Sequence, residues 1–294
     1  MSSPARPSNP DLDHLIIVRT RSTLRARVEN WRQAGLRIAL VPTMGALHEG
    51  HLSLVKMAKA NADKVIVSVF VNPLQFAPAE DLERYPRDEQ GDMIKLNTVG
   101  ADVMYVPDPE EMYTPNFSTS VRVDDVSEGL CGAARPHFFG GVTTVVTKLL
   151  LQALPDIAVF GEKDYQQLCV IRRLVRDLDI PVEILAAPTM REHDGLAMSS
   201  RNAYLTDHGR QVAGQMNVAL KAAASALAAG EAVGRVADQG WQDLMDAGFD
   251  TIDYFEIRDA ETLEPLGTGP LSGPARVFAA AWIDKTRLID NWAV

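Results

Sequence analysis

The sequence of 294 residues predicts an α/β protein, with a Rossmann-like, doubly wound parallel sheet followed by a smaller C-terminal α+β domain. Two observations predict this class. Over the first two thirds of the chain, short apolar runs alternate with segments whose apolar residues recur at helical spacing, which is typical of parallel strands covered by helices on both faces. After Leu205 the order changes, and two helical segments precede strand-like ones.

Each predicted strand of the parallel sheet is a short, mostly apolar run. We expect these strands at residues 37–41, 64–71, 101–106, 156–161 and 182–186. The second run is β-branched almost throughout, which favours a strand buried on both faces. Helical spacing predicts helices over residues 51–62, 88–100, 141–153 and 164–177. A sheet of this kind binds ligands where the carboxyl ends of its strands open onto a crevice.

The smaller domain is predicted from two helices and at least two strands. The helices are expected over residues 209–229 and 232–247, and the strands near 253–258 and 275–283. The change of pattern places the domain boundary between Met190 and Asp207. We therefore expect a mobile tail over residues 1–12, the Rossmann-like domain over 13–190 and the smaller domain over 191–294.

Composition and charge narrow the class of function. The formal net charge is −10, and the last 84 residues hold 6 basic and 12 acidic side chains. Because nucleic-acid binding depends on Lys and Arg neutralising phosphates, this balance argues against it. No apolar run reaches the ~20 residues of a membrane span, and the first ten residues lack the apolar core of a signal peptide. We expect a cytoplasmic protein that acts on small molecules, with Cys131 and Cys169 as packed thiols.

The first strand leads into a segment that suits an anion. Met44-Gly-Ala-Leu-His-Glu-Gly-His51 contains two glycines, which allow the backbone to approach a ligand, and a helix is predicted to begin near His48. The N-terminus of a helix attracts anions, and two histidines three residues apart share one face of its first turn. This arrangement favours a polyphosphate site. The alternative is a helix cap with two solvated histidines.

Polar residues also follow the strand over 156–161. Lys163 stands just beyond the strand, where its ammonium can reach a phosphate, and Asp164 is expected to cap the next helix. Gln166 and Gln167 begin that helix and can offer amides to a polar substrate. The alternative is a cap with a surface salt bridge.

Two further segments carry candidate contacts. Residues 197–202, Ala-Met-Ser-Ser-Arg-Asn, lie at the domain boundary and have the hydroxyls and the arginine that a loop closing over a triphosphate would need. Asn72 and Gln75, beside apolar Leu74 and Phe76, suit a small, branched, hydroxylated substrate. A β-turn with an Asx hydrogen bond is the alternative for Asn72. The other histidines show no metal-ligand spacing; they are His14, His137, His193 and His208.

Four motifs in this order resemble the pantoate–β-alanine ligase (pantothenate synthetase) family. They are H-x-G-H at 48–51, F-V-N-P-L-Q-F at 70–76, F-G-E-K-D-Y-Q-Q-L at 160–168 and D-G-L-A-M-S-S-R-N at 194–202. The resemblance runs from about Ile38 to Leu205 and more loosely to the C-terminus. H-x-G-H alone would indicate only the wider nucleotidyltransferase superfamily.

The resemblance implies an AMP-forming acid–amine ligase of the coenzyme A pathway. Such an enzyme condenses pantoate with β-alanine through a pantoyl-adenylate, uses ATP as co-substrate with Mg²⁺ bridging the phosphates, and is commonly a homodimer. His51, His48 and Lys163 would be catalytic. The family's ATP positions correspond here to Met44, Gly45, Ala46, Leu47, His48, Glu49, Gly50, His51, Gly161, Glu162, Lys163, Asp164, Met190, Met198, Ser199, Ser200 and Arg201. Gln75, Gln167 and Asn72 would bind pantoate, Gln75 also β-alanine, and no metal ligand is assigned.

One stretch departs from the family pattern. Residues 135–142 read R-P-H-F-F-G-G-V where R-P-G-H-F-x-G-V is expected, so His137 is not assigned to the site. We also expect the acidic smaller domain, hinged near Met190, to act as a lid that excludes water. Two other functions remain open at this point: a different nucleotidyltransferase or aminoacyl-tRNA synthetase-like protein, and a non-catalytic module that senses ATP.

Overall fold

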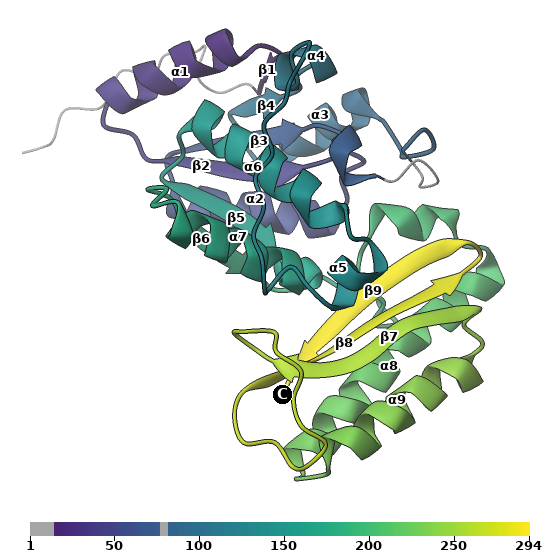
Figure 1. Ribbon diagram of the computed structural model, residues 1–294. Coiled ribbons are helices and arrows are strands. Elements are labelled where there is room, and N and C mark those ends of the chain that lie inside the picture. Colours follow the sequence, from purple (N-terminus) through teal and green to yellow (C-terminus); the bar gives the residue numbers. More distant parts are fainter. Residues whose placement is uncertain (1–14, 77–81) are drawn as a thin grey trace, which may run out of the picture.

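The computed structural model describes residues 15–76 and 82–294, and it has two parts (Figure 1). The predicted tail over residues 1–12 lies outside the described residues. The larger part is a parallel sheet with helices on both faces, and the smaller is an antiparallel sheet with two helices on one face. This confirms the predicted fold class.

The larger sheet has six strands in the order β1-β4-β3-β2-β5-β6, and every pair is parallel. Its strands are β1 (Ile16–Val18), β2 (Ile38–Thr43), β3 (Lys64–Val69), β4 (Val103–Tyr105), β5 (Ile157–Gly161) and β6 (Glu183–Ala187). The chain builds outward from β2 on one side and then returns to add β5 on the other. Sheets of this kind open a crevice at such a switch point, beyond the carboxyl ends of the strands.

Alternating residues of the central strands supply two separate cores. Ile38 and Leu40 of β2 pack with α1 (Arg21–Gln33), α6 (Phe138–Ala153) and α7 (Tyr165–Asp177), whereas Ala39 and Val41 pack with α2 (Glu49–Asn61) and α3 (Glu89–Thr98). Two short helices, α4 (Pro109–Met112) and α5 (Leu130–Ala134), lie between β4 and α6. Burial on both faces explains why these strands are apolar throughout.

The smaller sheet has the order β7-β8-β9, with β7 (Thr251–Asp259), β8 (Ala275–Ile283) and β9 (Thr286–Ala293) all antiparallel. Val277 and Ala279 pack against α8 (Asp207–Ala228) and α9 (Val233–Ala247). Phe278, pointing the other way, joins the core of the larger part. The small sheet is thus sandwiched between its own helices and the parallel sheet's domain (Figure 1).

The elements that were not predicted include β1, β9 and α1, besides the short helices α4 and α5. β1 has only three residues, and β9 carries polar residues at buried positions, so neither shows a plain strand pattern. The third, α1, buries only a narrow stripe of Leu24, Val28 and Trp31. In addition, α6 begins three residues earlier than expected, and a 3-10 turn, η3 (Glu162–Asp164), precedes α7.

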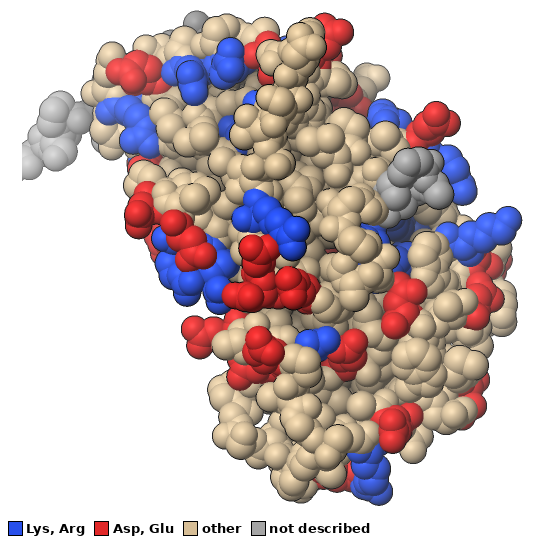
Figure 2. Space-filling model, in the orientation of Figure 1, with Lys and Arg blue, Asp and Glu red and all other residues tan. Residues whose placement is uncertain are grey.

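Charge is mixed on the surface shown in Figure 2, where small acidic and basic groups lie side by side. That face carries no extended basic area of the kind that neutralises nucleic-acid phosphates. Among the described residues, none of the helices combines the length and the apolarity that crossing a bilayer requires.

Candidate active site

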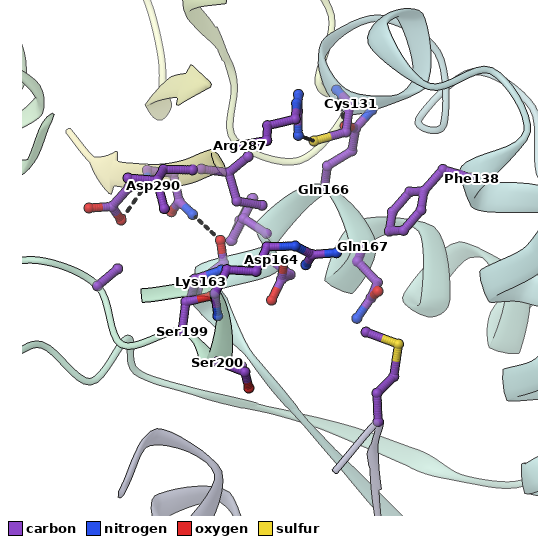
Figure 3. A pocket seen from close by; sticks show the side chains of 18 of the residues that line it. Cys131, Phe138, Lys163, Asp164, Gln166, Gln167, Ser199, Ser200, Arg287 and Asp290 are labelled. Atoms are coloured by element: carbon purple, nitrogen blue, oxygen red, sulfur yellow. Dashed lines mark hydrogen bonds and ion pairs between the residues drawn. The ribbon is translucent and has the colours of Figure 1, made fainter. Parts of the chain in front are cut away.

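A cavity of about 1130 Å³ lies between the two domains, at the switch point between β2 and β5. Its wall is formed by the segments that follow β2, β3, β5 and β6, together with residues of the small sheet. Figure 3 shows side chains from these distant segments around one space, among them Lys163, Gln167, Ser199 and Ser200. The fold therefore brings together the four motifs that the sequence singled out.

His48 and His51 cap α2 reciprocally. His48 Nδ1 accepts the backbone N–H of Gly50 at 3.2 Å, and His51 Nδ1 accepts the backbone N–H of His48 at 3.3 Å. The ring centroids are 4.1 Å apart. Because each Nδ1 accepts, a neutral imidazole at either position carries its proton on Nε2. The predicted helix cap is confirmed, and the same two residues line the cavity, where their role towards a phosphate stays a prediction.

The histidines are neutral near pH 7. Burial, with Lys163 and Lys95 nearby, lowers the pKa of His48 to about 4. Burial, then His48 and the same two lysines, lowers the pKa of His51 well below its ordinary value. The pair can thus offer hydrogen bonds to a phosphate without adding formal charge.

The turn before the histidines faces away from the cavity. Asp92 of α3 accepts the backbone N–H of Ala46 at 2.9 Å and that of Leu47 at 2.7 Å, and Lys95 donates to the carbonyl of Leu47. Ala46 adopts a left-handed φ of 49°. Five of the predicted ATP residues are absent from the cavity wall: Gly45, Ala46 and Leu47 of this turn, together with Glu49 and Glu162. Ala46 and Leu47 form a support that Asp92 holds in place, and the N–H of Gly45 donates to Thr43 Oγ1.

Lys163 lies in η3, directly after β5, and its side chain lines the cavity. Its ammonium is 3.8 Å from Asp164 Oδ1, which also lines the cavity. Glu162 turns the other way, and its carboxylate lies 3.4 Å from Arg276 Nη2. The ion pair with Arg276 keeps the Glu162 carboxylate away from the cavity, whereas Lys163 and Asp164 line it.

The serine–arginine segment (residues 197–202) lies against the turn that leads into the histidine pair (residues 44–51). Ser199 caps the short helix η4 (Ser200–Tyr204), and Ser200 Oγ donates to the carbonyl of Ala46 at 3.0 Å. The Arg201 guanidinium lies 5.6 Å from the centre of the Tyr85 ring. Met190, Met198 and the residues from Ser199 to Arg201 all line the cavity.

The two amides predicted beside β3 have different environments. Asn72 is fully buried; its Nδ2 donates to Gln75 Oε1 and the Gly141 carbonyl, and its Oδ1 accepts from Tyr113 and Leu74. Gln75 lines the cavity, and its Nε2 makes no hydrogen bond within the described residues. Asn72 lies behind the wall and orients Gln75.

Gln166 and Gln167 also differ. Gln166 is buried, and its Oε1 accepts the backbone N–H of Cys131 while its Nε2 donates to carbonyls at Val126, Glu128 and Gly129. Gln166 also borders the cavity, but its Oε1 and Nε2 are bonded within the protein, which disfavours the expectation that it offers an amide to a substrate. The amide of Gln167 has no such partner within residues 15–76 and 82–294, and it lines the cavity.

Several cavity residues were not anticipated from the sequence. Arg135 donates to the Gln75 carbonyl at 2.9 Å and stacks over the Phe138 ring at 4.0 Å. The small sheet contributes Arg287, Asp290 and Asn291. The adjacent polar residues Asp290 and Asn291 interrupt the apolar alternation of β9, and such an interruption can indicate a site. β9 itself was not predicted from the sequence, so this indication was missed.

These features define an enzyme class. A switch-point cavity with a capped histidine pair, a lysine after the next strand and a serine–arginine segment fits a nucleotide-binding enzyme of the H-x-G-H type, with a second, amide-lined pocket for an acid. The family model described as pantoate-beta-alanine ligase matches residues 16–293. The chain belongs to this family, and it is an ATP-dependent ligase.

Relatives and solved structures agree with this family assignment. The chain is 57% identical over 280 residues to the pantothenate synthetase of Caulobacter vibrioides, covering 95% of this chain and 98% of that protein. It is similar to the crystal structure of pantothenate synthetase from Thermus thermophilus, with a TM-score of 0.88, 44% identity and coverage of 94% and 98%. A ligase from Francisella tularensis, complexed with beta-gamma ATP and beta-alanine, has a TM-score of 0.80 at 32% identity, with coverage of 95% and 97%.

Proposed function

We propose that this enzyme makes pantothenate in two steps inside the cavity between its domains. A carboxylate oxygen of pantoate bonds to the α-phosphorus of ATP, and the bond from that phosphorus to the bridging oxygen breaks, which releases pyrophosphate. The amine nitrogen of β-alanine then bonds to the acyl carbon of pantoyl-adenylate, and AMP leaves. The observation that carries the proposal is that one cavity is lined by Lys163, the histidine pair, Gln75 with its Nε2 donors, and Gln167.

ATP would bind on the side of the cavity built by β2, β5 and the serine–arginine segment. The lining residues from the predicted set are Met44, His48, Gly50, His51, Gly161, Lys163, Asp164, Met190, Met198, Ser199, Ser200 and Arg201. The ammonium of Lys163 and the guanidinium of Arg201 supply positive charge, and the neutral imidazoles supply Nε2–H donors. Donors fixed before the reaction stabilise the charge that develops on the phosphates.

Pantoate would lie against the amides. Gln75 presents an N–H donor whose direction Asn72 fixes, and Gln167 presents a second amide from the start of α7. We assign pantoate to both and β-alanine to the neighbourhood of Gln75. Asn72 serves pantoate only through Gln75.

Magnesium fits as an ion that arrives with ATP. No group of three or more His, Cys, Asp or Glu side chains within the described residues is arranged to hold a metal. Mg²⁺ bound to substrate phosphates needs only one or two carboxylates, and Asp164 on the cavity wall can supply one. When bound, the ion would neutralise phosphate charge.

The remaining expectations are part of the same proposal. The resemblance supports a cytoplasmic location and a homodimer. Sedimentation at several protein concentrations tests the oligomeric state.

The smaller domain would act as a lid over the adenylate. Arg191 forms a two-point ion pair with Asp290 of β9 and is therefore attached to the smaller domain. A hinge at Met190 would lie one residue before this attachment. If ATP leaves the hydrogen exchange of residues 198–202 unchanged, closure of that loop is ruled out.

Mass detection of the products tests the reaction. Purified protein with ATP, Mg²⁺, pantoate and β-alanine should yield pantothenate and AMP in equal amounts, and omitting β-alanine should leave pyrophosphate release that depends on pantoate. Lys163→Ala and His51→Ala should each lower the adenylation rate by ~10²-fold, because each removes stabilisation of transition-state charge. ATP binding without turnover would instead favour a sensor module.

A further inference from the structure

A side chain of the smaller domain holds the backbone of the segment that carries Lys163. The Nδ2 of Asn291, on β9, donates to the carbonyl oxygens of Glu162 and Lys163, each at 2.9 Å. Asn291 is only 4% exposed, so water does not compete for these bonds. Figure 3 shows β9, with Asp290 labelled, beside the segment of Lys163.

The orientation of the Asn291 amide is itself fixed. Its Oδ1 accepts a hydrogen bond from Arg276 Nη1. The Arg276 guanidinium stacks 3.6 Å from the centre of the Tyr165 ring, and its Nη2 lies 3.4 Å from Glu162 Oε2. Because the arginine can only donate, the amide oxygen must face it and the amide nitrogen must face the two carbonyls.

Docking of the two domains does not depend on this amide. Phe278 and Tyr254 of the small sheet already belong to the apolar core of the larger domain, and the Phe278 ring lies 6.1 Å from that of Tyr165. A buried amide adds little to such an apolar contact, since its desolvation offsets most of what its hydrogen bonds contribute. The Asn291 amide instead fixes the direction of the Lys163 backbone, because it binds the carbonyl before the Lys163 Cα (that of Glu162) and the carbonyl after it (that of Lys163).

We propose that Asn291 is a positioning residue for the adenylation step, which it serves by fixing the backbone from which Lys163 extends into the cavity. The inference rests on the proposed role of Lys163. A side chain that must meet a phosphate loses much of its effect when its anchor shifts by ~1 Å. The smaller domain thereby sets the geometry of a nucleotide contact that belongs to the larger domain.

The test is a double-mutant cycle between Asn291 and Lys163. Asn291→Asp keeps the shape and the partner Arg276 but replaces both donors by an oxygen facing two carbonyl oxygens. The measured quantity is kcat/KM for ATP, from pantoate-dependent exchange of labelled pyrophosphate into ATP. We expect a ~10-fold loss in the wild-type background, the size of one or two net hydrogen bonds, and less than ~2-fold in the Lys163→Ala background.

Trp292→Phe is the matched control. It changes the adjacent residue of β9, whose ring stacks with Arg191 and Lys221 rather than reaching η3, and should leave the rate within ~2-fold in both backgrounds. If Asn291→Asp does not fold, Asn291→Ala takes its place in the cycle. Affinity for a non-hydrolysable ATP analogue, measured by calorimetry in the same variants, should show the same coupling.

The outcomes separate the two proposals. Equal losses from Asn291→Asp in both backgrounds would overturn the inference, since Asn291 would then act independently of Lys163. Unchanged activity of Asn291→Asp in the wild-type background would overturn it as well. A Lys163→Ala variant with nearly normal rate would instead remove Lys163 from the proposed function, and the positioning role with it.

Discussion

The imidazoles of His48 and His51 lie with ring centroids 4.1 Å apart, and the Nδ1 of His51 accepts the backbone N–H of His48. These two side chains thus cap the N-terminus of α2 and also line the cavity. The cap uses both Nδ1 atoms and leaves both Nε2 atoms outside it, so a cap and a contact with a ligand are compatible at the same two residues.

The histidine pair predicts a specific dependence of stability on pH. In the folded protein the pKa of His48 is lowered to about 4 and that of His51 well below 6.5, whereas both take up protons near 6.5 when the chain unfolds. Because the unfolded state then binds more protons, the free energy of unfolding should fall as the pH drops from about 6.5 towards 4. The decrease should be smaller in a variant combining His48→Gln and His51→Gln.

Urea unfolding at several pH values measures this effect. His193→Gln is the control, because it removes an exposed imidazole that does not line the cavity. A double variant that loses as much stability on acidification as the wild type would mean that the histidines do not titrate as described.

Asp92 is predicted to support the active site from outside the cavity. Asp92→Asn keeps one oxygen acceptor but turns an amide nitrogen towards the N–H of either Ala46 or Leu47. We expect a loss of about 1–3 kcal/mol in stability and a ~10-fold lower adenylation rate, because the histidine turn moves. Asp88→Asn, the same change at the exposed cap of α3, should alter neither, since Asn also caps helices.

The adjacent residues Gln166 and Gln167 are predicted to have opposite phenotypes. Gln166→Ala leaves the Cys131 N–H and three carbonyls without their partner, so unfolding should cost about 2–3 kcal/mol less. Gln167→Ala should leave stability within about 0.5 kcal/mol and raise the KM for pantoate ~10-fold. Thermal unfolding and initial rates distinguish them, and two variants with the same pair of effects would contradict these roles.

Gln75→Ala should mainly weaken the use of pantoate. The change removes the one amide N–H that Asn72 directs into the cavity, so we expect the KM for pantoate to rise ~10-fold or more while that for ATP stays within ~2-fold. Asn72→Ala should give a smaller effect of the same kind together with a loss of stability. Altered ATP dependence with normal pantoate dependence would reassign Gln75.

Local pattern was enough to predict the parallel sheet, and the polar residues after its strands identified a part of the cavity wall. Ile38 to Val41 are apolar without interruption because each alternate residue packs into a different core. The strands also show where their polar continuations begin, so His48 after β2 and Lys163 after β5 could be assigned to one edge of the sheet before its strand order was known.

Direction and long-range partners could not be predicted. Within each pair, Asn72 with Gln75 and Gln166 with Gln167, both side chains carry an amide and lie close together in the sequence. Only the tertiary contacts decide which of the two amides faces a ligand. The turn over residues 45–47 has suitable glycine and backbone donors, but Asp92, 45 positions beyond Leu47, takes two of those donors. The contribution of β9 was missed because its buried positions include Asp290 and Asn291, which break the alternation that signals a strand.

The contact between Asn72 and Gln75 has a consequence for selectivity among analogues. With its oxygen held by Asn72, the Gln75 amide cannot flip, so it meets a ligand only as a donor. Compounds that present an ammonium group at this point would leave two donors facing each other and be rejected, whereas those that present a carboxylate or a hydroxyl oxygen would be accepted. β-Alanine would therefore turn its carboxylate, and not its ammonium, towards Gln75. Inhibitors aimed at the acid pocket should therefore keep an oxygen acceptor here.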